Sequence, residues 1–548
     1  MSEERVKIKL KDREFDAEKG ANLMEAMVSV GLMVRSDCGG RGRCGKCMVR
    51  VEASGQHALS NPDETERNRL DEGRLDAGWR LSCRTRIYDH ISIEIPAESR
   101  LTADVVQKGL PILLSRLKTP RSIQRPASAP AYGVAVDLGT TTLAVYLCDL
   151  ENGTVAGSTS IRNPQAIFGD DVISRISAAN TVEFGLLRLQ KMAIQAMDWA
   201  VSALCRQLHI DPLRIGCGTV VGNSTMIHLF LAEDPSSIGV FPFSLRFSED
   251  RIQSGAGIGI KFNPDVRLHT LPLISGYLGA DLIGAALAVD IFTQPSGTML
   301  VDVGTNGEIL LVTDDGFAAT SCATGPALEG ASILHGMQAT SGAIDSVRFD
   351  FKNGCLDYTL IQSEPNHPQP PSGLCGSGVI SAVAELLRAG VITKSGSFNA
   401  DFRSPCLRKT EKNTIEFEIV NGQTSRSGSS IVLTQPDVRA VQLAKGALRT
   451  GIESLCRENQ MKQPVKILLA GAFGSYINKA DALRIGMFPG MPEEDIEVVG
   501  NAAGAGAILA LFDDAYFKKA RDVAQRIQVL ELAGLADFQN SFIEHLGF

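Results

Sequence analysis

The chain has 548 residues, with 54 Lys or Arg against 62 Asp or Glu, so its formal net charge is −8. Such a mild acidic balance favours neither a nucleic-acid partner nor a membrane-surface partner. The charged opening MSEERVKIKL lacks the apolar core of a signal peptide, and the apolar stretch at 502–512 is too short to span a bilayer. We therefore expect a cytoplasmic protein of two or more domains.

The first hundred residues have the pattern of one small domain. Residues 6–10 alternate apolar and polar side chains, which predicts a strand, and a turn and a return strand follow. Asn22 is placed to cap a short helix that Gly31 can end. Beyond a cysteine-rich loop, residues 47–52 and 90–96 alternate again. The order strand, strand, helix, loop, strands is typical of a β-grasp fold.

Twelve cysteines are too few for a secreted disulfide scaffold of this length, so metal or redox chemistry is the favoured use. Eight of them stand singly in the sequence: Cys148, Cys205, Cys217, Cys322, Cys355, Cys375, Cys406 and Cys456. The other four have the spacing C-x5-C-x2-C followed by one distant cysteine: Cys38, Cys44, Cys47 and Cys83.

This spacing favours iron over zinc, because four-ligand zinc sites usually supply a second close pair of ligands. Plant-type 2Fe-2S clusters use C-x4-C-x2-C with a distant fourth cysteine, and the present loop is one residue longer. Glycines can absorb the extra length and let backbone N–H groups approach the cluster sulfurs. The loop contains four of them: Gly39, Gly40, Gly42 and Gly45. A zinc knuckle or a set of reduced thiols remains the alternative.

Taken whole, residues 1–97 resemble a 2Fe-2S ferredoxin domain, with the one-residue-longer loop of the vertebrate and bacterial branch. Three basic residues of the loop, Arg41, Arg43 and Lys46, either dock an acidic electron donor or are ordinary solvated charge. Residues 98–131 carry four prolines and little periodicity, which predicts a linker.

From residue 132 the pattern changes. Residues 132–150 predict a buried strand, a turn rich in Gly and Thr, and a second strand. Residues 299–311 repeat this strand, turn, strand pattern, so we expect duplicated halves that face one nucleotide. Residues 466–477 form a buried strand that ends in glycines, against which an adenine and a ribose can lie.

The turns supply candidate phosphate ligands. In the first hairpin, backbone N–H groups and hydroxyls are expected to wrap phosphate oxygens, and Asp137 can hold Mg²⁺ through water. The phosphate candidates there are Gly139, Thr140, Thr141 and Thr142. The corresponding residues of the second hairpin and the glycines of the third segment are Asp302, Gly304, Thr305, Asn306, Gly307, Gly471 and Gly474.

These three segments, in this order, are similar to the signature of the acetate kinase, sugar kinase, Hsp70 and actin superfamily. The resemblance implies that residues 132–548 form a two-lobed, actin-like ATPase. Residues 275–288 look like its first connecting helix, which makes Asp281 a candidate base or water-positioning residue, or else a helix cap. Residues 498–511 look like the second connecting helix, whose small side chains permit a close crossing and a hinge.

A further helix is predicted from Thr434, which can cap it, with Pro436 in the first turn. On this helix Gln442 and Lys445 either reach the nucleotide or are solvated at the surface.

Three other residues are open to two readings each. His228 and His335 have apolar neighbours, which favours core histidines over cobalt contacts. Cys375 lies in a glycine-rich turn that can face phosphate or a partner, although a buried free thiol is the simpler interpretation.

A ferredoxin domain in front of an actin-like ATPase closely resembles the reductive activators of corrinoid-dependent enzymes, over nearly the whole chain. Further segments that carry the resemblance are residues 163–176, 220–230, 323–339 and 373–378. It implies ATP-dependent transfer of one electron from a 2Fe-2S cluster to the Co(II) corrinoid of a methyltransferase corrinoid protein, which regenerates Co(I). It also implies ATP and Mg²⁺ as cofactors and a low-potential donor such as a ferredoxin, a flavodoxin or a reductase. A homodimer is compatible with it.

Other function classes stay open at this point. One is a small-molecule kinase of the sugar kinase-like superfamily with a regulatory cluster, another an ATP-driven electron injector for a different low-potential enzyme, and a third a non-enzymatic chaperone of cofactor proteins. Under the activator hypothesis, closure of the ATPase grips the corrinoid protein and weakens or removes an axial cobalt ligand.

Overall fold

The structure, a computed structural model, describes residues 4–11, 13–36, 38–42, 44–53, 57–101, 131–330, 333–362, 369–410, 413–471 and 477–548. These residues divide into two compact units. The first unit holds the described residues up to 101 together with 131–279 and 510–514. The second unit holds the described residues of 280–509 and 515–548. The predicted linker lies almost wholly outside the described residues.

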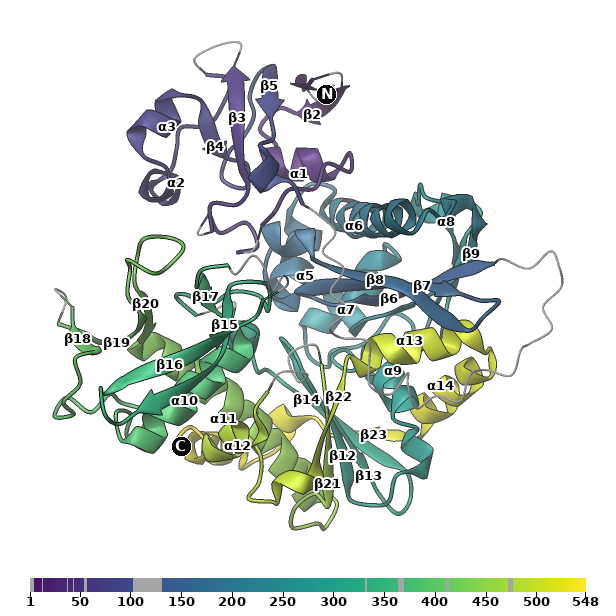
Figure 1. The fold of residues 1–548 in the computed structure, drawn as a ribbon. Helices are drawn as coiled ribbons and strands as arrows, with labels where there is room; N and C mark the ends of the chain where they lie inside the picture. The colour runs from purple at the N-terminus through teal and green to yellow at the C-terminus, as the bar shows by residue number, and fades with distance from the viewer. Residues whose placement is uncertain are drawn as a thin grey trace. The chain divides into compact units, whose positions relative to one another are not determined.

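The first unit begins with a five-stranded sheet in the order β2-β1-β5-β3-β4 (Figure 1). Val6 and Ile8 of β1 point into its core, as their alternation predicts. Asn22 caps the first helix by accepting the Glu25 N–H at 3.2 Å, and the helix ends at Val28, three residues before Gly31. The elements are β1 (Arg5–Leu10), β2 (Arg13–Glu18), α1 (Leu23–Val28), β3 (Met48–Ala53), α2 (Glu64–Arg69), α3 (Glu72–Asp76), β4 (Trp79–Leu81) and β5 (Ile91–Glu94).

The rest of the first unit is built on a six-stranded sheet in the order β10-β11-β9-β6-β7-β8. Helix α6 packs on β7 and β8, and its apolar face supplies much of the core of this unit. The elements are β6 (Tyr132–Leu138), β7 (Thr142–Asp149), β8 (Thr154–Arg162), α5 (Val172–Thr181), α6 (Gly185–Leu208), β9 (Ile215–Val221), α7 (Ser224–Phe230), β10 (Ile252–Ser254), α8 (Gly255–Ile258) and β11 (Arg267–Thr270).

The second unit has its own six-stranded sheet, in the order β22-β21-β12-β13-β14-β23. Its elements begin with α9 (Ala280–Ala288), β12 (Thr298–Val303), β13 (Gly307–Val312), β14 (Phe317–Cys322), β15 (Ala343–Asp350), β16 (Cys355–Leu360), β17 (Gly373–Leu374) and α10 (Gly376–Ala389). They continue with β18 (Leu407–Lys409), β19 (Ile415–Val420), β20 (Ile431–Thr434), α11 (Gln435–Glu458), β21 (Lys466–Ala470), α12 (Lys479–Arg484), β22 (Ile496–Gly500), α13 (Ala502–Phe512), α14 (Ala515–Arg526), β23 (Ile527–Val529) and α15 (Phe538–Glu544).

Five strands of each six-stranded sheet share one topology, and the sixth strand differs, since β10 pairs with β11 whereas β23 pairs with β14. In the first, β6, β7 and β8 form an antiparallel meander, and β9 and then β11 join the free side of β6 in parallel. In the second, β12, β13 and β14 form the meander, and β21 and then β22 join β12 in parallel. This repetition confirms the predicted duplicated, actin-like architecture behind a β-grasp domain.

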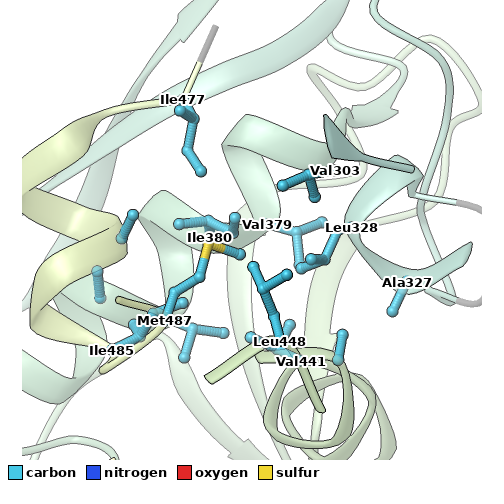
Figure 2. Close-up of a cluster of buried hydrophobic side chains, with 14 of the residues drawn as sticks. Val303, Ala327, Leu328, Val379, Ile380, Val441, Leu448, Ile477, Ile485 and Met487 are labelled. Carbon is cyan, nitrogen blue, oxygen red and sulfur yellow. The ribbon is translucent and has the colours of Figure 1, made fainter. Parts of the chain in front are cut away.

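The core of the second unit is a cluster of buried aliphatic side chains (Figure 2). Val303 from β12 and Leu328 lie beside Val379 and Ile380 from α10, and Leu448 from α11 lies close by. Helix α11 starts as predicted, because Thr434 forms a capping box with Asp437 and Pro436 sits in the first turn. The cluster attaches the long helix α11 and the strand that carries Asp302 to the same core.

Within the second unit, helices α9 and α13 cross at glycines. A Cβ added to Gly506 would lie 1.9 Å from the Gly284 carbonyl oxygen, and one added to Gly284 would lie 2.8 Å from the Ala503 oxygen. The close crossing expected from the small residues is therefore present, while its use as a hinge stays a prediction.

Two cysteines that stand singly in the sequence are paired in space. Cys355 and Cys406 form a disulfide with their Cα atoms 5.7 Å apart. The two cysteines are 51 positions apart in the sequence, and their pairing brings together the start of β16 and the residue before β18, which no local signal indicates.

Among the described residues, no helix is long and apolar enough to cross a membrane.

Candidate functional site

The four spaced cysteines lie around one loop of the β-grasp domain. The sulfur atoms of Cys47 and Cys83 are 3.2 Å apart, and Cys44 neighbours Cys38. The hydrogen bond with Cys83 lowers the pKa of Cys47, while the same contact and burial raise the pKa of Cys83. The hydrogen bond with Cys38 and burial raise the pKa of Cys44. Two neighbouring thiol pairs are thus within electrostatic reach of one another.

The glycines of this loop are required by its backbone. Gly39, Gly40, Gly42 and Gly45 all have positive φ, between +64° and +85°. A Cβ on Gly42 would lie 2.8 Å from the Thr65 side chain, and one on Gly45 would lie 2.7 Å from the Arg69 side chain. Only glycine adopts this conformation in so little space without strain.

We tested whether these residues suit a 2Fe-2S cluster. The four cysteines lie as two neighbouring pairs around a glycine-rich loop, two of the four thiols are buried, and four thiols are the donor set that such a cluster takes. In the part of the chain that the structure describes, no three His, Cys, Asp or Glu side chains are already arranged as a finished metal-binding group. The residues fit the cluster, which supplies one-electron transfer when bound.

The basic residues of the loop have different surroundings. Arg41 pairs with Asp170, which lies in the same unit, with Nε 2.6 Å from the carboxylate. Lys46 is half-buried, and Arg43 lies outside the described residues. Of the two alternatives for Arg41, ordinary solvated charge does not hold, because Arg41 has a carboxylate partner in its own chain, and docking of an electron donor stays a prediction.

The first hairpin is held by side chains from the following segment. Three consecutive carbonyls of its turn accept hydrogen bonds: Gly139 from Asn163 Nδ2 at 2.9 Å, Thr140 from Arg175 Nη2 at 2.6 Å, and Thr141 from the Asn163 backbone N–H at 2.8 Å. Asn163 and Arg175 are both fully buried. In a trans peptide the N–H points away from the carbonyl, so the amides of Thr140 and Thr141 face the opposite side.

The other predicted residues of the first hairpin lie at the end of β6 and in the turn. Asp137 is the penultimate residue of β6 and is half-buried. The Thr140 hydroxyl accepts from Asn223 Nδ2 at 2.8 Å, and the Gly139 N–H donates to the Thr142 oxygen at 3.0 Å. A Cβ on Gly139 would lie 2.5 Å from that oxygen, so the turn closes too tightly for a side chain. The role of this turn in phosphate binding stays a prediction.

The second hairpin repeats this arrangement in the second unit. Asp302 is the penultimate residue of β12, as Asp137 is of β6. The Thr324 hydroxyl bonds the carbonyls of Gly304 at 3.0 Å and Thr305 at 3.1 Å, and the Thr305 hydroxyl donates to Glu329 at 3.0 Å.

The remaining residues predicted in this turn lie at its tip and base. The Asn306 carbonyl accepts the Gly304 N–H at 3.1 Å. Gly307 opens β13, where a Cβ would lie 2.9 Å from the Thr324 methyl group. In both turns, backbone carbonyls therefore accept hydrogen bonds from other groups of the protein.

Carboxylates gather beside the second hairpin. Glu308 pairs with Asp302 across β12 and β13 and is almost completely buried. Burial, followed by the negative charges of Asp281 and Asp302, raises the pKa of the Glu308 carboxyl well above its usual value. Glu329 adds a smaller effect of the same sign. Asp281 itself lies in the first turn of α9, half-buried.

The third predicted segment begins at the same edge. Strand β21 runs parallel to β12, and Gly471, with φ +100°, directly follows it. A Cβ there would lie 2.8 Å from Asp302 Oδ1, so the backbone passes directly over the Asp302 carboxylate. Gly474 lies outside the described residues.

Lys445 is not at the surface. Its side chain is 2% exposed, its ammonium donates to the Gly547 carbonyl, and it lies over the Phe548 ring at 5.4 Å. Gln442, also buried, donates to the Leu546 carbonyl at 2.6 Å. The prediction of solvated side chains is therefore wrong for both residues, because residues 546–548 cover them. A nucleotide contact stays a prediction.

Burial decides between the alternatives for His228 and Cys375, but not for His335. His228 is fully buried, with Nδ1 2.7 Å from the Ser224 oxygen and its ring stacked on Phe247, so it is a core histidine. Cys375 is a buried thiol at the start of α10. His335 is only half-buried, and burial lowers its pKa.

The residues that hold the two turns were not predicted as site residues. Asn163, Arg175 and Asn223 serve the first turn, and Thr324 and Glu329 serve the second. They lie about 20 to 80 residues from the turns, and each is of a type common in loops and helices. Their only signal in the sequence was membership of segments that carried the family resemblance.

A ferredoxin-type iron–sulfur loop and two duplicated phosphate-type hairpins define the class: an iron–sulfur protein with an actin-like ATPase fold. Three family models match the chain: a 2Fe-2S iron-sulfur cluster binding domain at residues 6–88, the RACo middle region at 132–294, and the C-terminal domain of RACo, the ASKHA domain, at 296–548.

Individual relatives agree with these models. The chain is 32% identical to the "Corrinoid activation enzyme RamQ" of Eubacterium limosum, over 92% of this chain and 93% of the relative. It is 25% identical to the "[Co(II) methylated amine-specific corrinoid protein] reductase" of Methanosarcina barkeri, over 76% and 77% of the two chains. A solved "Reductive activator for corrinoid,iron-sulfur protein" is 28% identical, with a TM-score of 0.71 and 99% and 98% coverage. The chain belongs to the RACo family of corrinoid activators.

Proposed function

We propose that this protein is an ATP-dependent reductive activator of a corrinoid protein. One electron passes from the reduced 2Fe-2S cluster to a Co(II) corrinoid, so the cluster is oxidised by one electron and cobalt is reduced to Co(I). The observation that supports this most directly is the presence, in one chain, of the four-cysteine glycine loop and two equivalent hairpin turns whose carbonyls are bonded to protein groups. The relatives named above, which are a corrinoid activation enzyme and a corrinoid protein reductase, support the same substrate class.

The need for ATP follows from the potentials. A plant-type 2Fe-2S centre sits at about −400 mV, and each ~59 mV uphill costs about 1.4 kcal/mol for one electron. Reduction of a Co(II) corrinoid to Co(I) demands a lower potential still. A nucleotide that binds one conformation of the protein better than another can shift its population, and the altered surroundings can raise the cobalt potential. ATP therefore has a role that a simple electron carrier does not need.

Mg²⁺ is part of the proposal. The carboxylates of Asp281, Asp302 and Glu329 beside the second hairpin would repel a bare triphosphate. Carboxylate oxygens are the protein ligands that Mg²⁺ prefers, and the ion also binds phosphate. Asp137 is the residue proposed to hold it through water, and Asp302 lies at the matching strand end in the second unit. Asp281 is the proposed water-positioning residue.

The client and the donor are proposed by chemical class. The client is the corrinoid protein of a methyltransferase system, and the donor is a low-potential carrier such as a ferredoxin, a flavodoxin or a reductase. A cytoplasmic location and a homodimer also stay proposals.

The decisive experiment is anaerobic visible spectroscopy of a Co(II) corrinoid protein mixed with the reduced protein, with and without Mg-ATP. The proposal expects the Co(I) band only when Mg-ATP is present. Hydrolysis of ATP with no change at cobalt would contradict it and leave the ATPase with another client. A phosphorylated small molecule as product would favour a kinase instead.

A further inference from the structure

The segment Asn163–Asp170, here called the bridging segment, directly follows β8 in the first unit. Its first residue holds the first hairpin through two hydrogen bonds, from Asn163 N to the Thr141 oxygen and from Asn163 Nδ2 to the Gly139 oxygen. The same side chain caps the 3-10 turn that follows, by accepting the Gln165 N–H at 3.0 Å. A displacement of the hairpin turn would therefore move this segment through these hydrogen bonds.

The other end of the bridging segment contacts the iron–sulfur loop. The Asp170 carboxylate accepts from Arg41 Nε at 2.6 Å and from Arg162 Nη2 at 3.1 Å. A Cβ on Gly39 would lie 2.7 Å from Asp170 Oδ1, and one on Gly40 would lie 3.5 Å from the Ile167 Cα. The loop that follows Cys38 thus packs backbone against backbone on this segment.

Arg175 rigidifies the connection between the hairpin turn and the bridging segment. Its guanidinium is fully buried and donates to the Thr140 oxygen of the hairpin at 2.6 Å, to the Gly169 oxygen at 3.0 Å, and to Gln165 Oε1 at 3.1 Å. Because the guanidinium group is planar and rigid, it sets the distance between the hairpin turn and the residue next to Asp170. A short, buried hydrogen-bonded path therefore joins the phosphate turn to the iron–sulfur loop.

We propose that the bridging segment couples nucleotide at the first hairpin to the docking of the iron–sulfur loop, with Asp170 as the positioning residue. This inference rests on the proposed function, since it requires nucleotide at the turn and a cluster at the loop. The amides of Thr140 and Thr141 share their peptide planes with the carbonyls of Gly139 and Thr140, which accept hydrogen bonds from Asn163 and Arg175. A phosphate that binds these amides therefore shifts the groups bonded to Asn163 and Arg175. The bridging segment passes that change to Asp170 and hence to Arg41.

Coupling between two sites is reciprocal. Nucleotide binding changes the strength of loop docking, and docking changes the nucleotide affinity by the same factor. Residues Gly39 and Gly40 form the edge of the loop that the bridging segment covers. Release of the loop from the bridging segment would expose this edge to an electron-transfer partner. Nucleotide binding and the access of a partner to the cluster are then thermodynamically coupled.

The test follows backbone hydrogen exchange of residues 36–49 by mass spectrometry, on the anaerobic, cluster-loaded protein, with and without a non-hydrolysable ATP analogue and Mg²⁺. Equilibrium dialysis of the same analogue measures binding separately, and visible absorption of each variant confirms that the cluster is intact. In the wild type, nucleotide should change loop exchange by about fivefold or more, the lower end of usual coupling factors. Asp170→Asn should still bind the analogue but lose this response.

Two variants serve as controls. Asp234→Asn breaks a comparable surface pair with Arg246, 3.0 Å apart in the same unit, and should keep the wild-type response. Glu25→Gln breaks another contact of the β-grasp domain within this unit, a bidentate ion pair with Arg188 on α6. It should raise loop exchange without nucleotide and still respond to nucleotide, because this pair is not bonded to the hairpin.

Two results would overturn the coupling alone: a wild-type protein that binds the analogue with no change in loop exchange, or an Asp170→Asn protein that responds like the wild type. Absence of analogue binding by the wild type would overturn both the coupling and the ATP-dependent function proposed above.

Discussion

Asp302 and Glu308 lie directly opposite each other on β12 and β13, and Glu308 has almost no exposure to solvent. Burial and the nearby carboxylates of Asp281 and Asp302 raise the pKa of the Glu308 carboxyl well above its usual value. The Gly471 backbone packs over Asp302, because a Cβ on Gly471 would lie 2.8 Å from Asp302 Oδ1. The raised pKa of Glu308 disfavours a second negative charge opposite Asp302, the residue proposed to act in the nucleotide site.

Asp302→Ala is expected to abolish ATP dependence. Removal of the charged group at the second hairpin should slow ATP-dependent Co(I) formation about 100-fold or more, as loss of a preorganised charged group at an active site does. ATP-dependent complex formation with the corrinoid protein, followed by gel filtration, should be lost as well. Asp315→Ala, in the exposed turn before β14, is the matched control and should behave as wild type. Cobalt reduction at the normal rate by Asp302→Ala would contradict the assignment.

Cys44→Ser is expected to prevent assembly of the 2Fe-2S cluster, because the other three cysteines cannot complete four-thiolate ligation. Iron and sulfide per chain, and the visible absorption of the cluster, should fall to near background after anaerobic reconstitution. Co(I) formation should vanish even with Mg-ATP present. Cys217→Ser, at a half-buried thiol on β9, tests whether loss of any cysteine has this effect and should leave the cluster intact.

Lys445→Met is expected to change how stability depends on pH. Burial, with a smaller contribution from Arg449, lowers the pKa of Lys445 from 10.5 to about 8 in the folded protein. Between pH 8 and 10.5 the unfolded chain therefore holds more protons than the folded chain, so this group makes stability rise with pH across that window. Below about pH 8 the cost of the buried charge is fully present.

Urea unfolding midpoints from pH 7 to 10.5 measure this effect as the difference between wild type and variant. The difference should favour Lys445→Met most at pH 7 and shrink as the pH rises. Lys462→Met, at an exposed lysine, supplies the control slope. Parallel curves for the wild type and Lys445→Met would show that the buried ammonium does not titrate in this window.

Gly506→Ala is expected to destabilise the crossing of α9 and α13. The new methyl group would lie 1.9 Å from the Gly284 oxygen, a backbone atom that cannot move without separating the helices. Overpacking of this kind costs about 1–3 kcal/mol, which thermal unfolding can measure. Gly534→Ala adds the same methyl group where no heavy atom lies within 4 Å, and its stability should stay within about 0.5 kcal/mol of wild type. Equal stability of the two variants would refute the tight crossing.

Much of the site could be predicted because its signals are local. The cysteine spacing, the glycines that need positive φ and the Thr434 capping box each depend on residues a few positions apart. The strand, turn, strand pattern of the two hairpins is also local, and the structure has both. The partners of the turns were missed, because Asn163 and Thr324 carry no local pattern that links them to a carbonyl about 20 residues away.

The sequence by itself determined the β-grasp order of elements through periodicity and caps, and the duplicated actin-like architecture through two similar hairpins and a family resemblance. The cysteine spacing predicts the ligand set of the iron–sulfur loop, because that spacing depends on a few local residues. Only the tertiary structure decided that Arg41 meets Asp170, 129 residues away, and that residues 546–548 bury Lys445. It also decided that Cys355 pairs with Cys406. The physical reason is the same in each case: burial and ion pairing depend on which distant surfaces the packed core brings together, and that information is spread over the whole chain.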